Sequence, residues 1–278
     1  MKTKTKSIRN IIEWTPIYSM WLREIIRFFT RRTRVISTVV QPLIFLMLLA
    51  LPMSQLFGQV PPQLQQVMFG GLPFFSFLVP GIVGMGLLFS GIMGGVTVLW
   101  DKEFGFLKEV MVAPVRRISL IVGRSLGNMT TAMFQALITI GIALIFGIWY
   151  GFHIQSIVGF LLAIVFMVLT FAAFVGFGLT LGGLFEETEG FMTFTNLIQM
   201  PIFFLSGAII PINQLKGIPV LYQVQFINPL TYGVDGIRAV LTGAPPSLPL
   251  WLDFVVILGC AILFLLLGAY AFSKMEVN

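Results

Sequence analysis

Asp-Lys-Glu-Phe-Gly-Phe-Leu-Lys-Glu-Val-Met-Val-Ala-Pro-Val-Arg-Arg, residues 101–117, separates two long uncharged blocks of the chain. This segment carries seven charged residues, whereas neither 35–100 nor 125–185 contains any Asp, Glu, Lys or Arg. A transmembrane helix needs about 20 consecutive apolar residues, so each block is long enough for two spans. We expect residues 101–117 to form a polar connection between two pairs of membrane helices.

Read as a helix that starts near Asp101, this connection has an apolar stripe. Phe104, Leu107 and Met111 fall at i, i+3 and i+7, with Phe106 and Val110 beside them. Charged residues border the stripe, which is typical of a helix that lies at a membrane surface and is held by a partner protein. An ordinary cytosolic loop fits the pattern equally well.

Composition places the chain in a membrane. Of its 278 residues, 57% are hydrophobic and 10% are charged, whereas soluble domains are about half apolar and about a quarter charged. The single Cys260 excludes an intrachain disulfide and a cysteine-based metal cluster. A net charge of +6 would suit nucleic acid, but the basic residues lie next to membrane segments and therefore report on topology.

Apolar runs predict an all-α integral membrane protein with six spans. The expected spans are 35–57, 73–99, 120–149, 154–184, 191–210 and 254–273. Proline residues at 42 and 52 are expected to kink the first span. Gly91 and Gly95 in the second have a small-xxx-small spacing that favours close helix packing. We expect an uncharged loop at 58–71.

The N-terminal 34 residues hold nine Lys and Arg against two Glu, and they predict an amphipathic helix at the membrane interface. The apolar face of this helix consists of Met20, Trp21, Ile25 and Phe28. The basic face consists of Arg23, Arg27, Arg31 and Arg34. With six spans, fifteen of the seventeen Lys and Arg lie on the side of both termini, which is therefore the cytoplasm.

Uncharged polar residues within the spans have two readings. Asn128 and Gln135 in the third span could hydrogen-bond between helices, which is the favoured reading, or line a substrate path. Asn196 and Gln199, close to Pro201 in the fifth span, could mark a gate and are the other two candidates for a substrate path. The spans contain no Asp or Glu at mid-depth to bind a coupling ion; we expect Arg124 to reach the interface and Asp253 to cap the sixth span.

No phosphate-binding loop of the Gly-Lys-Ser or Gly-Lys-Thr type follows a strand, and no pair of nucleophile and base is evident. We therefore expect a protein that is not an enzyme and holds no cofactor or metal. If it moves a substrate uphill, another polypeptide must supply the energy.

Four stretches resemble the ABC-2 family of transporter permeases, in particular its drug-, lipid- and nodulation-factor-exporter branch. They are residues 101–117, "GRSLGNMTTAMFQALI" at 123–138, "PIFFLSGAIIPINQL" at 201–215 and "INPLTYGVDGIRAVLTG" at 227–243. The resemblance implies a type V exporter fold: an interface helix in residues 1–34, and a six-span domain in 35–278 with short re-entrant helices on the outer side at 211–252. We expect one of these helices at about 230–241.

By the same resemblance, residues 101–117 contact an ATP-binding cassette subunit. The implied coupling residues are Asp101, Lys102, Glu103, Phe104, Gly105, Phe106, Leu107, Lys108, Val110, Met111, Pro114, Arg116 and Arg117. The outer motif matches at Pro229, Tyr232 and Arg238, whereas Pro211 stands where a small residue is more usual.

The resemblance also implies the partners: two copies of a cassette ATPase that bind ATP and Mg, and a second copy of this chain or a homologous permease in the membrane lipid. The expected function is ATP-driven outward movement of a drug, lipid or lipid-linked glycan across an inner or plasma membrane, with an organellar membrane also open. A polysaccharide-exporting permease, a passive channel and a membrane scaffold are the alternatives.

Overall fold

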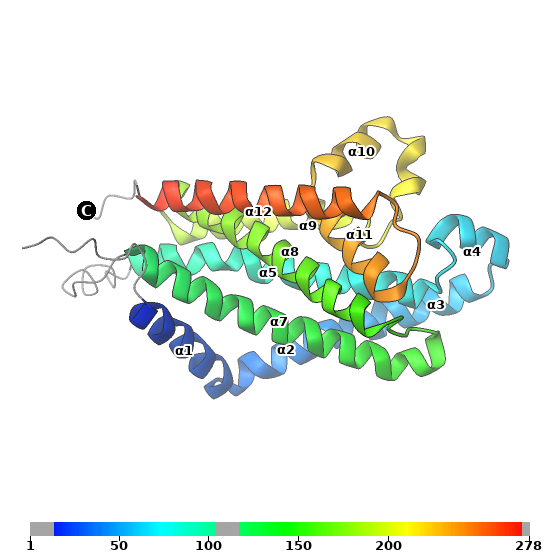
Figure 1. Ribbon diagram of the computed structural model, residues 1–278, viewed down its shortest axis with the longest axis horizontal. Coiled ribbons are helices and arrows are strands. Elements are labelled where there is room, and N and C mark those ends of the chain that lie inside the picture. Colours follow the sequence, from blue (N-terminus) through cyan, green and yellow to red (C-terminus); the bar gives the residue numbers. More distant parts are fainter. Residues whose placement is uncertain (1–13, 104–116, 274–278) are drawn as a thin grey trace, which may run out of the picture.

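A computed structural model describes residues 14–103 and 117–273, and in this part of the chain the secondary structure is entirely helical. Long helices lie side by side along the long axis of the molecule (Figure 1). The N-terminal helix α1 and the C-terminal end of α12 lie at one end of this bundle, and the short helices α4 and α10 lie at the other.

The helices follow the chain in this order: α1 (Trp14–Thr30), α2 (Arg32–Phe45), η1 (Leu46–Ala50), α3 (Leu51–Gly58), α4 (Pro62–Phe69), α5 (Phe74–Glu103), α7 (Arg117–Tyr150), α8 (Ile157–Leu184), α9 (Thr188–Phe204), η2 (Ile212–Gly217), α10 (Pro219–Val224), η3 (Gln225–Ile227), α11 (Pro229–Thr242) and α12 (Leu250–Ser273). The all-helical fold class expected from the sequence is confirmed.

Five stretches in the described residues are long and apolar enough to cross a membrane: Val35–Gly58, Gln63–Val96, Ser119–Tyr150, Ile157–Leu184 and Leu250–Ala271. The sixth expected span, 191–210, is shorter than predicted. Its helix α9 has 17 residues and ends at Phe204, three residues after Pro201, and the chain then turns at Gly207, whose φ is +75°. The six-span count therefore stays a prediction.

Proline alters the first span without ending it. Pro42 lacks the N–H that would continue the α-helical ladder. Four residues later the backbone adopts a π-helical turn, η1, in which the Leu51 N–H donates to the carbonyl oxygen of Leu46, five residues earlier. The helix resumes as α3, with Pro52 in its first turn, where a missing N–H is tolerated.

The glycines of the second span bring two long helices together, as their spacing predicts. A Cβ atom at Gly95 of α5 would collide with the carbonyl oxygen of Gly178 in α8, and one at Gly91 would lie 2.8 Å from the Cβ of Phe174. Only glycine fits such an approach of two backbones. The α5–α8 pair forms the centre of the bundle, and both core clusters include residues of these two helices.

The N-terminal amphipathic helix packs on the bundle. Its Ile17 backbone lies against Gly123 of α7, and the Glu24 side chain lies against Gly127 one turn later. The indole N–H of Trp21 donates to the Thr130 hydroxyl at 3.0 Å. The helix ends at Thr30, before Arg31, so α1 meets α2 at a sharp boundary.

Two local expectations need correction. The expected loop at 58–71 contains α4, which starts at Pro62 and ends at Phe69, before Gly70 with its left-handed φ of +65°. Asp253 does not cap the sixth span, because α12 begins at Leu250 and the Pro249 carbonyl oxygen accepts from the first-turn N–H groups. Asp101–Glu103 belong to α5, and the rest of the helix expected from about Asp101 lies outside the described residues.

Candidate functional site

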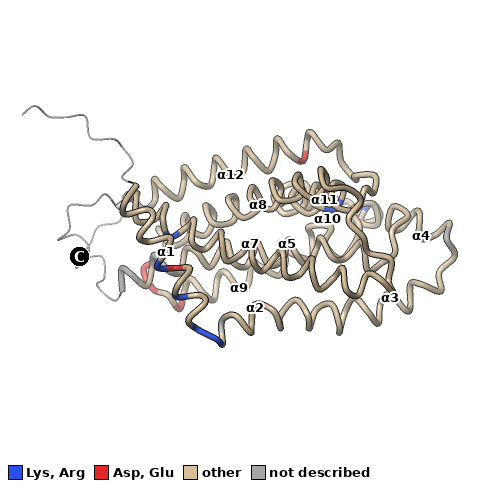
Figure 2. The backbone as a smooth tube through the Cα atoms, turned by 60° about the horizontal axis from the view of Figure 1, so that its bottom comes forward, with Lys and Arg blue, Asp and Glu red and all other residues tan. Residues whose placement is uncertain are grey.

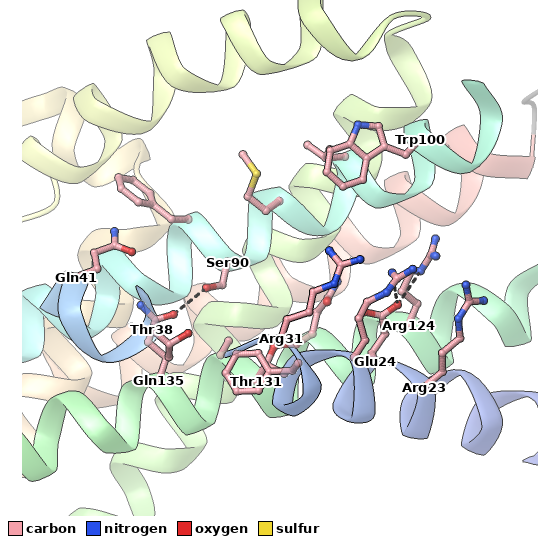
Figure 3. A pocket seen from close by; sticks show the side chains of 17 residues that line it. Arg23, Glu24, Arg31, Thr38, Gln41, Ser90, Trp100, Arg124, Thr131 and Gln135 are labelled. Carbon is pink, nitrogen blue, oxygen red and sulfur yellow. Dashed lines mark hydrogen bonds and ion pairs between the residues drawn. The ribbon is translucent and has the colours of Figure 1, made fainter. Parts of the chain in front are cut away.

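A cavity of about 720 Å³ lies between α1, α2, α5 and α7 (Figure 3). Such a volume is in the range of small-molecule binding sites. Its charged lining residues are Arg23, Glu24, Arg27, Arg31 and Arg124. Its uncharged polar lining residues are Thr38, Gln41, Ser90, Asn128, Thr131 and Gln135, and its apolar ones are Phe28, Phe89, Met93, Val96, Trp100 and Ala132.

The charged groups of the cavity are organised by Glu24. This carboxylate is only 4% exposed, and its Oε1 lies 3.4 Å from Nη1 of Arg27 and 3.6 Å from Nε of Arg124. Glu24 therefore holds guanidinium groups from two helices, α1 and α7, on one wall. A carboxylate in a buried site is stable only with such partners.

The other end of the cavity is uncharged. Ser90 of α5 donates to Oε1 of Gln135 of α7 at 3.4 Å, while Gln41 and Thr38 of α2 lie on the facing wall (Figure 3). Asn128 and Thr131 of α7 also line the cavity, and the Thr131 hydroxyl donates to the Asn128 backbone carbonyl oxygen at 2.9 Å. The cavity thus changes from basic to neutral polar along its length.

Two of the four residues proposed for a substrate path lie together here. Asn128 is 8% exposed, and it lines this cavity together with Gln135, about two turns later on the same face of α7. Neither Asn196 nor Gln199 is among the described residues of its lining: Asn196 is exposed on α9, and Gln199 is buried. The interhelical role also applies to Gln135, through its contact with Ser90.

Sequence reasoning placed the basic face of the N-terminal helix at the membrane interface and did not connect it with a cavity. Arg23 and Arg27 of α1 are four residues apart, so they share one helix face, and Arg31 follows in the junction between α1 and α2. That face points toward Arg124 and Asn128 because the apolar face of α1 packs on α7. The signal that could have found the site is Glu24, a single acidic residue within a basic helix.

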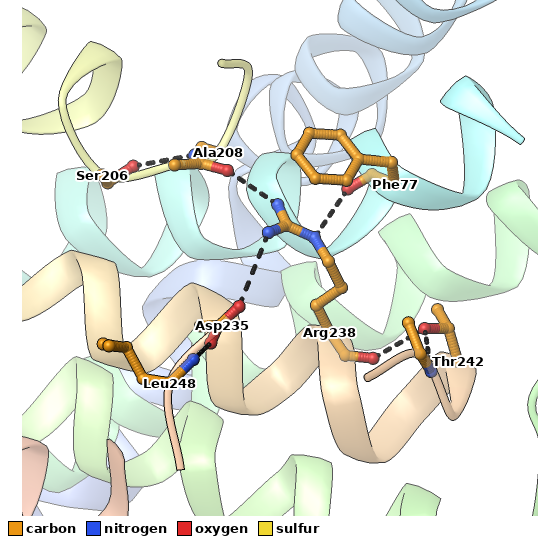
Figure 4. Close-up of polar contacts among 9 residues, drawn as sticks. Phe77, Ser206, Ala208, Asp235, Arg238, Thr242 and Leu248 are labelled. Atoms are coloured by element: carbon orange, nitrogen blue, oxygen red, sulfur yellow. Dashed lines mark hydrogen bonds and ion pairs between the residues drawn. The ribbon is translucent and has the colours of Figure 1, made fainter. Parts of the chain in front are cut away.

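A second polar cluster surrounds α11 (Figure 4), at the end of the bundle away from α1 (Figure 1). Arg238 donates from Nε to the Phe77 carbonyl oxygen at 3.1 Å and from Nη2 to the Gly207 carbonyl oxygen at 2.9 Å. Its Nη1 lies 4.0 Å from Oδ1 of Asp235. One side chain therefore joins α11 to α5 and to the turn after α9.

Asp235 and Tyr232 extend this cluster. Oδ2 of Asp235 accepts from the Leu248 N–H at 3.0 Å, which fixes the loop before α12, and the Tyr232 hydroxyl donates to the Phe226 carbonyl oxygen at 2.7 Å. Burial raises the pKa of the Asp235 carboxyl, while Arg238 and the Leu248 N–H act in the opposite direction. Burial also lowers the pKa of Arg238 to about 10, so this side chain remains cationic at neutral pH.

Among the residues of the outer motif, Pro229 starts α11, while Tyr232 and Arg238 are buried. The helix expected at about 230–241 is present as Pro229–Thr242. Arg238 of this motif is 5% exposed inside the bundle. One expectation is corrected: Arg124, expected to reach the interface, is buried and only 6% exposed.

Most of the implied coupling segment, 104–116, lies outside the described residues. Asp101–Glu103 and Arg117 belong to the helices that enter and leave it, α5 and α7. The Lys and Arg positions of α1 and the Asp and Glu positions before α9 gather at the same end of the bundle (Figure 2). The coupling role of the segment stays a prediction.

Most of the chain is similar in sequence to known membrane transport proteins. The family model described as ABC-2 type transporter matches residues 15–242. Inner membrane transport permease YadH of Escherichia coli K12 is 25% identical over 228 residues, which are 81% of this chain and 82% of that protein. Nodulation protein J of Rhizobium leguminosarum bv. trifolii is 26% identical, and the match covers 86% of this chain and 83% of that protein. Transport permease ycf38 of Cyanophora paradoxa is 23% identical, and the match covers 84% of this chain and 77% of that protein.

Proposed function

Because this chain belongs to the ABC-2 type transporter family, we propose that it is the permease subunit of an ATP-driven exporter that moves an amphiphilic or hydrophobic substrate outward. Two of the relatives carry the name transport permease, which supports the transport role. A drug, a lipid and a lipid-linked glycan all have the required chemistry. The same family membership is why we assign the chain a non-catalytic role in the membrane.

The observation that carries the proposal is the cavity between α1, α2, α5 and α7. Its walls come from helices that include three of the five candidate spans, and it lies at the end of the bundle where α1 and the basic residues gather. Positive residues mark the cytoplasmic side of membrane proteins. A substrate would therefore enter the cavity from the cytoplasm or the inner leaflet, as export requires.

The energy for transport would come from a cassette ATPase that binds ATP and Mg, with residues 101–117 as its contact. Two such ATPases act on each other, so we propose two copies of this chain, or this chain with a homologous permease, in one complex. The mass of the detergent-extracted complex tests this point. A stable complex of one permease and one ATPase with full ATPase activity would contradict it.

The membrane would be an inner or plasma membrane, with both termini in the cytoplasm. YadH is an inner membrane permease by name, and the positive residues at one end of the bundle support the orientation. Accessibility of cysteines introduced at Ser7 and at Asn213, probed with an impermeant thiol reagent in right-side-out vesicles, tests it. Labelling of the Ser7 position and not of the Asn213 position would reverse the orientation.

Transport itself is tested by reconstitution. The chain is co-expressed with a cassette ATPase of its own genome, the pair is placed in liposomes, and ATP-dependent movement of a fluorescent lipid is measured. Asn128→Leu, which alters the cavity wall, should lower the flux severalfold. Asn213→Leu, the same change at an exposed position of η2, should not.

Two outcomes would overturn the proposal. Saturable flux of a small inorganic ion without ATP would indicate a passive channel. Failure of the chain to bind any cassette ATPase of its own genome, with no flux of any amphiphile, would indicate a scaffold without transport.

A further inference from the structure

The inner cavity has an uneven charge. Four arginines and one glutamate line it, so the formal charge of its lining is 4 − 1 = +3. These charged side chains occupy one end, and the hydroxyl and amide groups of Ser90, Gln41 and Gln135 occupy the other (Figure 3). A concave site with one sign of charge and apolar walls concentrates ligands of the opposite charge.

The arginines are also held in position. Glu24 is buried and lies within 3.6 Å of guanidinium nitrogens of both Arg27 and Arg124. One carboxylate cannot neutralise the lining, but it can restrict the two guanidinium groups to one wall. Guanidinium presents several N–H donors in a plane, which suits the oxygens of a phosphate better than a single point charge would.

We propose that this cavity binds the phosphate head group of an amphiphile. The phosphate lies among Arg27, Arg31 and Arg124, and the uncharged part of the ligand extends toward Ser90 and Gln135. An amphiphile fits better than inorganic phosphate because the cavity is about 720 Å³ and its wall includes Phe89. That this ligand is the exported substrate rests on the proposed function; the binding itself does not.

The first experiment measures binding to the purified permease alone in a neutral detergent. The probe is radiolabelled dodecyl phosphate, with inorganic phosphate and dodecyl maltoside as unlabelled competitors. We expect one saturable site for each chain, which an excess of neither competitor empties. Displacement by inorganic phosphate as effective as by unlabelled dodecyl phosphate would show that the site takes a free anion and would overturn the assignment to an amphiphile.

Matched variants locate the site. Arg27→Gln and Arg31→Gln should each weaken dodecyl phosphate binding about tenfold or more, since each removes a charge-assisted hydrogen bond. Arg32→Gln removes the same charge from a side chain that is exposed like Arg31 but lies outside the cavity lining, so it should leave the affinity within about twofold.

A steric pair tests the neutral end of the cavity. Gln41→Trp fills it from an exposed position of α2, whereas Val40→Trp places the same ring on the adjacent exposed position outside the lining. Only the first should reduce binding. Thermal unfolding of each variant in detergent establishes that it is folded.

Equal affinities for the wild type, the two cavity arginine variants and Arg32→Gln would overturn the proposal. Since these measurements use no ATPase, that failure would leave the proposed transport function in place. Conversely, loss of ATPase coupling would leave the binding result unchanged.

Discussion

The guanidinium carbon of Arg238 lies 3.8 Å from the centroid of the Phe77 ring, and Nε of the same arginine donates to the Phe77 carbonyl oxygen at 3.1 Å. The two residues are 161 positions apart in the chain, in α11 and α5. The aromatic ring and the backbone carbonyl oxygen of Phe77 therefore both contact the Arg238 guanidinium group. This contact fixes the short helix α11 to a long membrane helix at the end of the bundle away from α1.

Replacing Arg238 should loosen that end of the bundle. Arg238→Gln leaves the carbonyl oxygens of Phe77 and Gly207 without their charged donor and leaves Asp235 buried beside a neutral group. Breaking a buried ion pair by removing one partner costs about 3 to 5 kcal/mol. The variant should unfold at a clearly lower temperature in detergent. Tyr232→Phe removes only the hydrogen bond to the Phe226 carbonyl oxygen, so it should lower the free energy of unfolding by about 1 kcal/mol. An equal loss of stability in the two variants would contradict the central role of Arg238.

Packing of α5 on α8 should depend on Gly95. Gly95→Ala puts a Cβ atom into the carbonyl oxygen of Gly178, and overpacking of this kind costs about 1 to 3 kcal/mol. Gly141→Ala is the matched control, because a Cβ at this helical position of α7 meets no atom within 4 Å. The control should keep or raise the unfolding temperature, since alanine is the better helix former. The unfolding temperatures of both variants are compared with that of the wild type. An unchanged unfolding temperature of Gly95→Ala would show that α5 and α8 can move apart at little cost.

Coupling to the ATPase should depend on apolar anchors more than on charges. Phe104→Ala and Leu107→Ala should each weaken assembly with the ATPase by about 1 to 3 kcal/mol, because a few buried side chains dominate most interfaces. Lys108→Glu should cost about 1 kcal/mol or less, as exposed ion pairs do. Gly105→Trp should uncouple ATP hydrolysis from transport. Co-purification and substrate-stimulated hydrolysis measure these effects, and intact assembly and stimulation in Phe104→Ala, Leu107→Ala and Gly105→Trp would place the coupling element elsewhere.

Glu24 should have opposite effects on stability and on anion binding. Glu24→Gln removes the buried carboxylate that Arg27 and Arg124 share, so the variant without ligand should unfold at a lower temperature. The same change raises the formal charge of the cavity lining from +3 to +4, so dodecyl phosphate should bind more tightly and stabilise the variant more than the wild type. Binding weaker than in the wild type would contradict this prediction and would indicate that the positioning of Arg27 and Arg124 by Glu24 matters more for binding than the added charge.

Local pattern was sufficient for several elements of the fold. The uncharged runs on either side of residues 101–117 placed the long helices, since a helix that crosses lipid needs one continuous apolar stretch. The spacing of Gly91 and Gly95 predicted the close packing that they make on α8, although it did not identify the partner. The end of α9 at Phe204 was less predictable, because proline is tolerated in some membrane helices and ends others.

The sequence by itself determined the all-helical membrane class and the positions of most helices, because both follow from hydropathy and from residues that are neighbours along the chain. Only the tertiary structure decided where the charged side chains lie. The basic face of α1 faces a cavity because α1 packs on Gly123 and Gly127 of α7, and Arg238 is buried because α11 folds back against Phe77. These contacts join residues far apart in sequence, and hydropathy along a single helix carries no information about which distant helix will cover it.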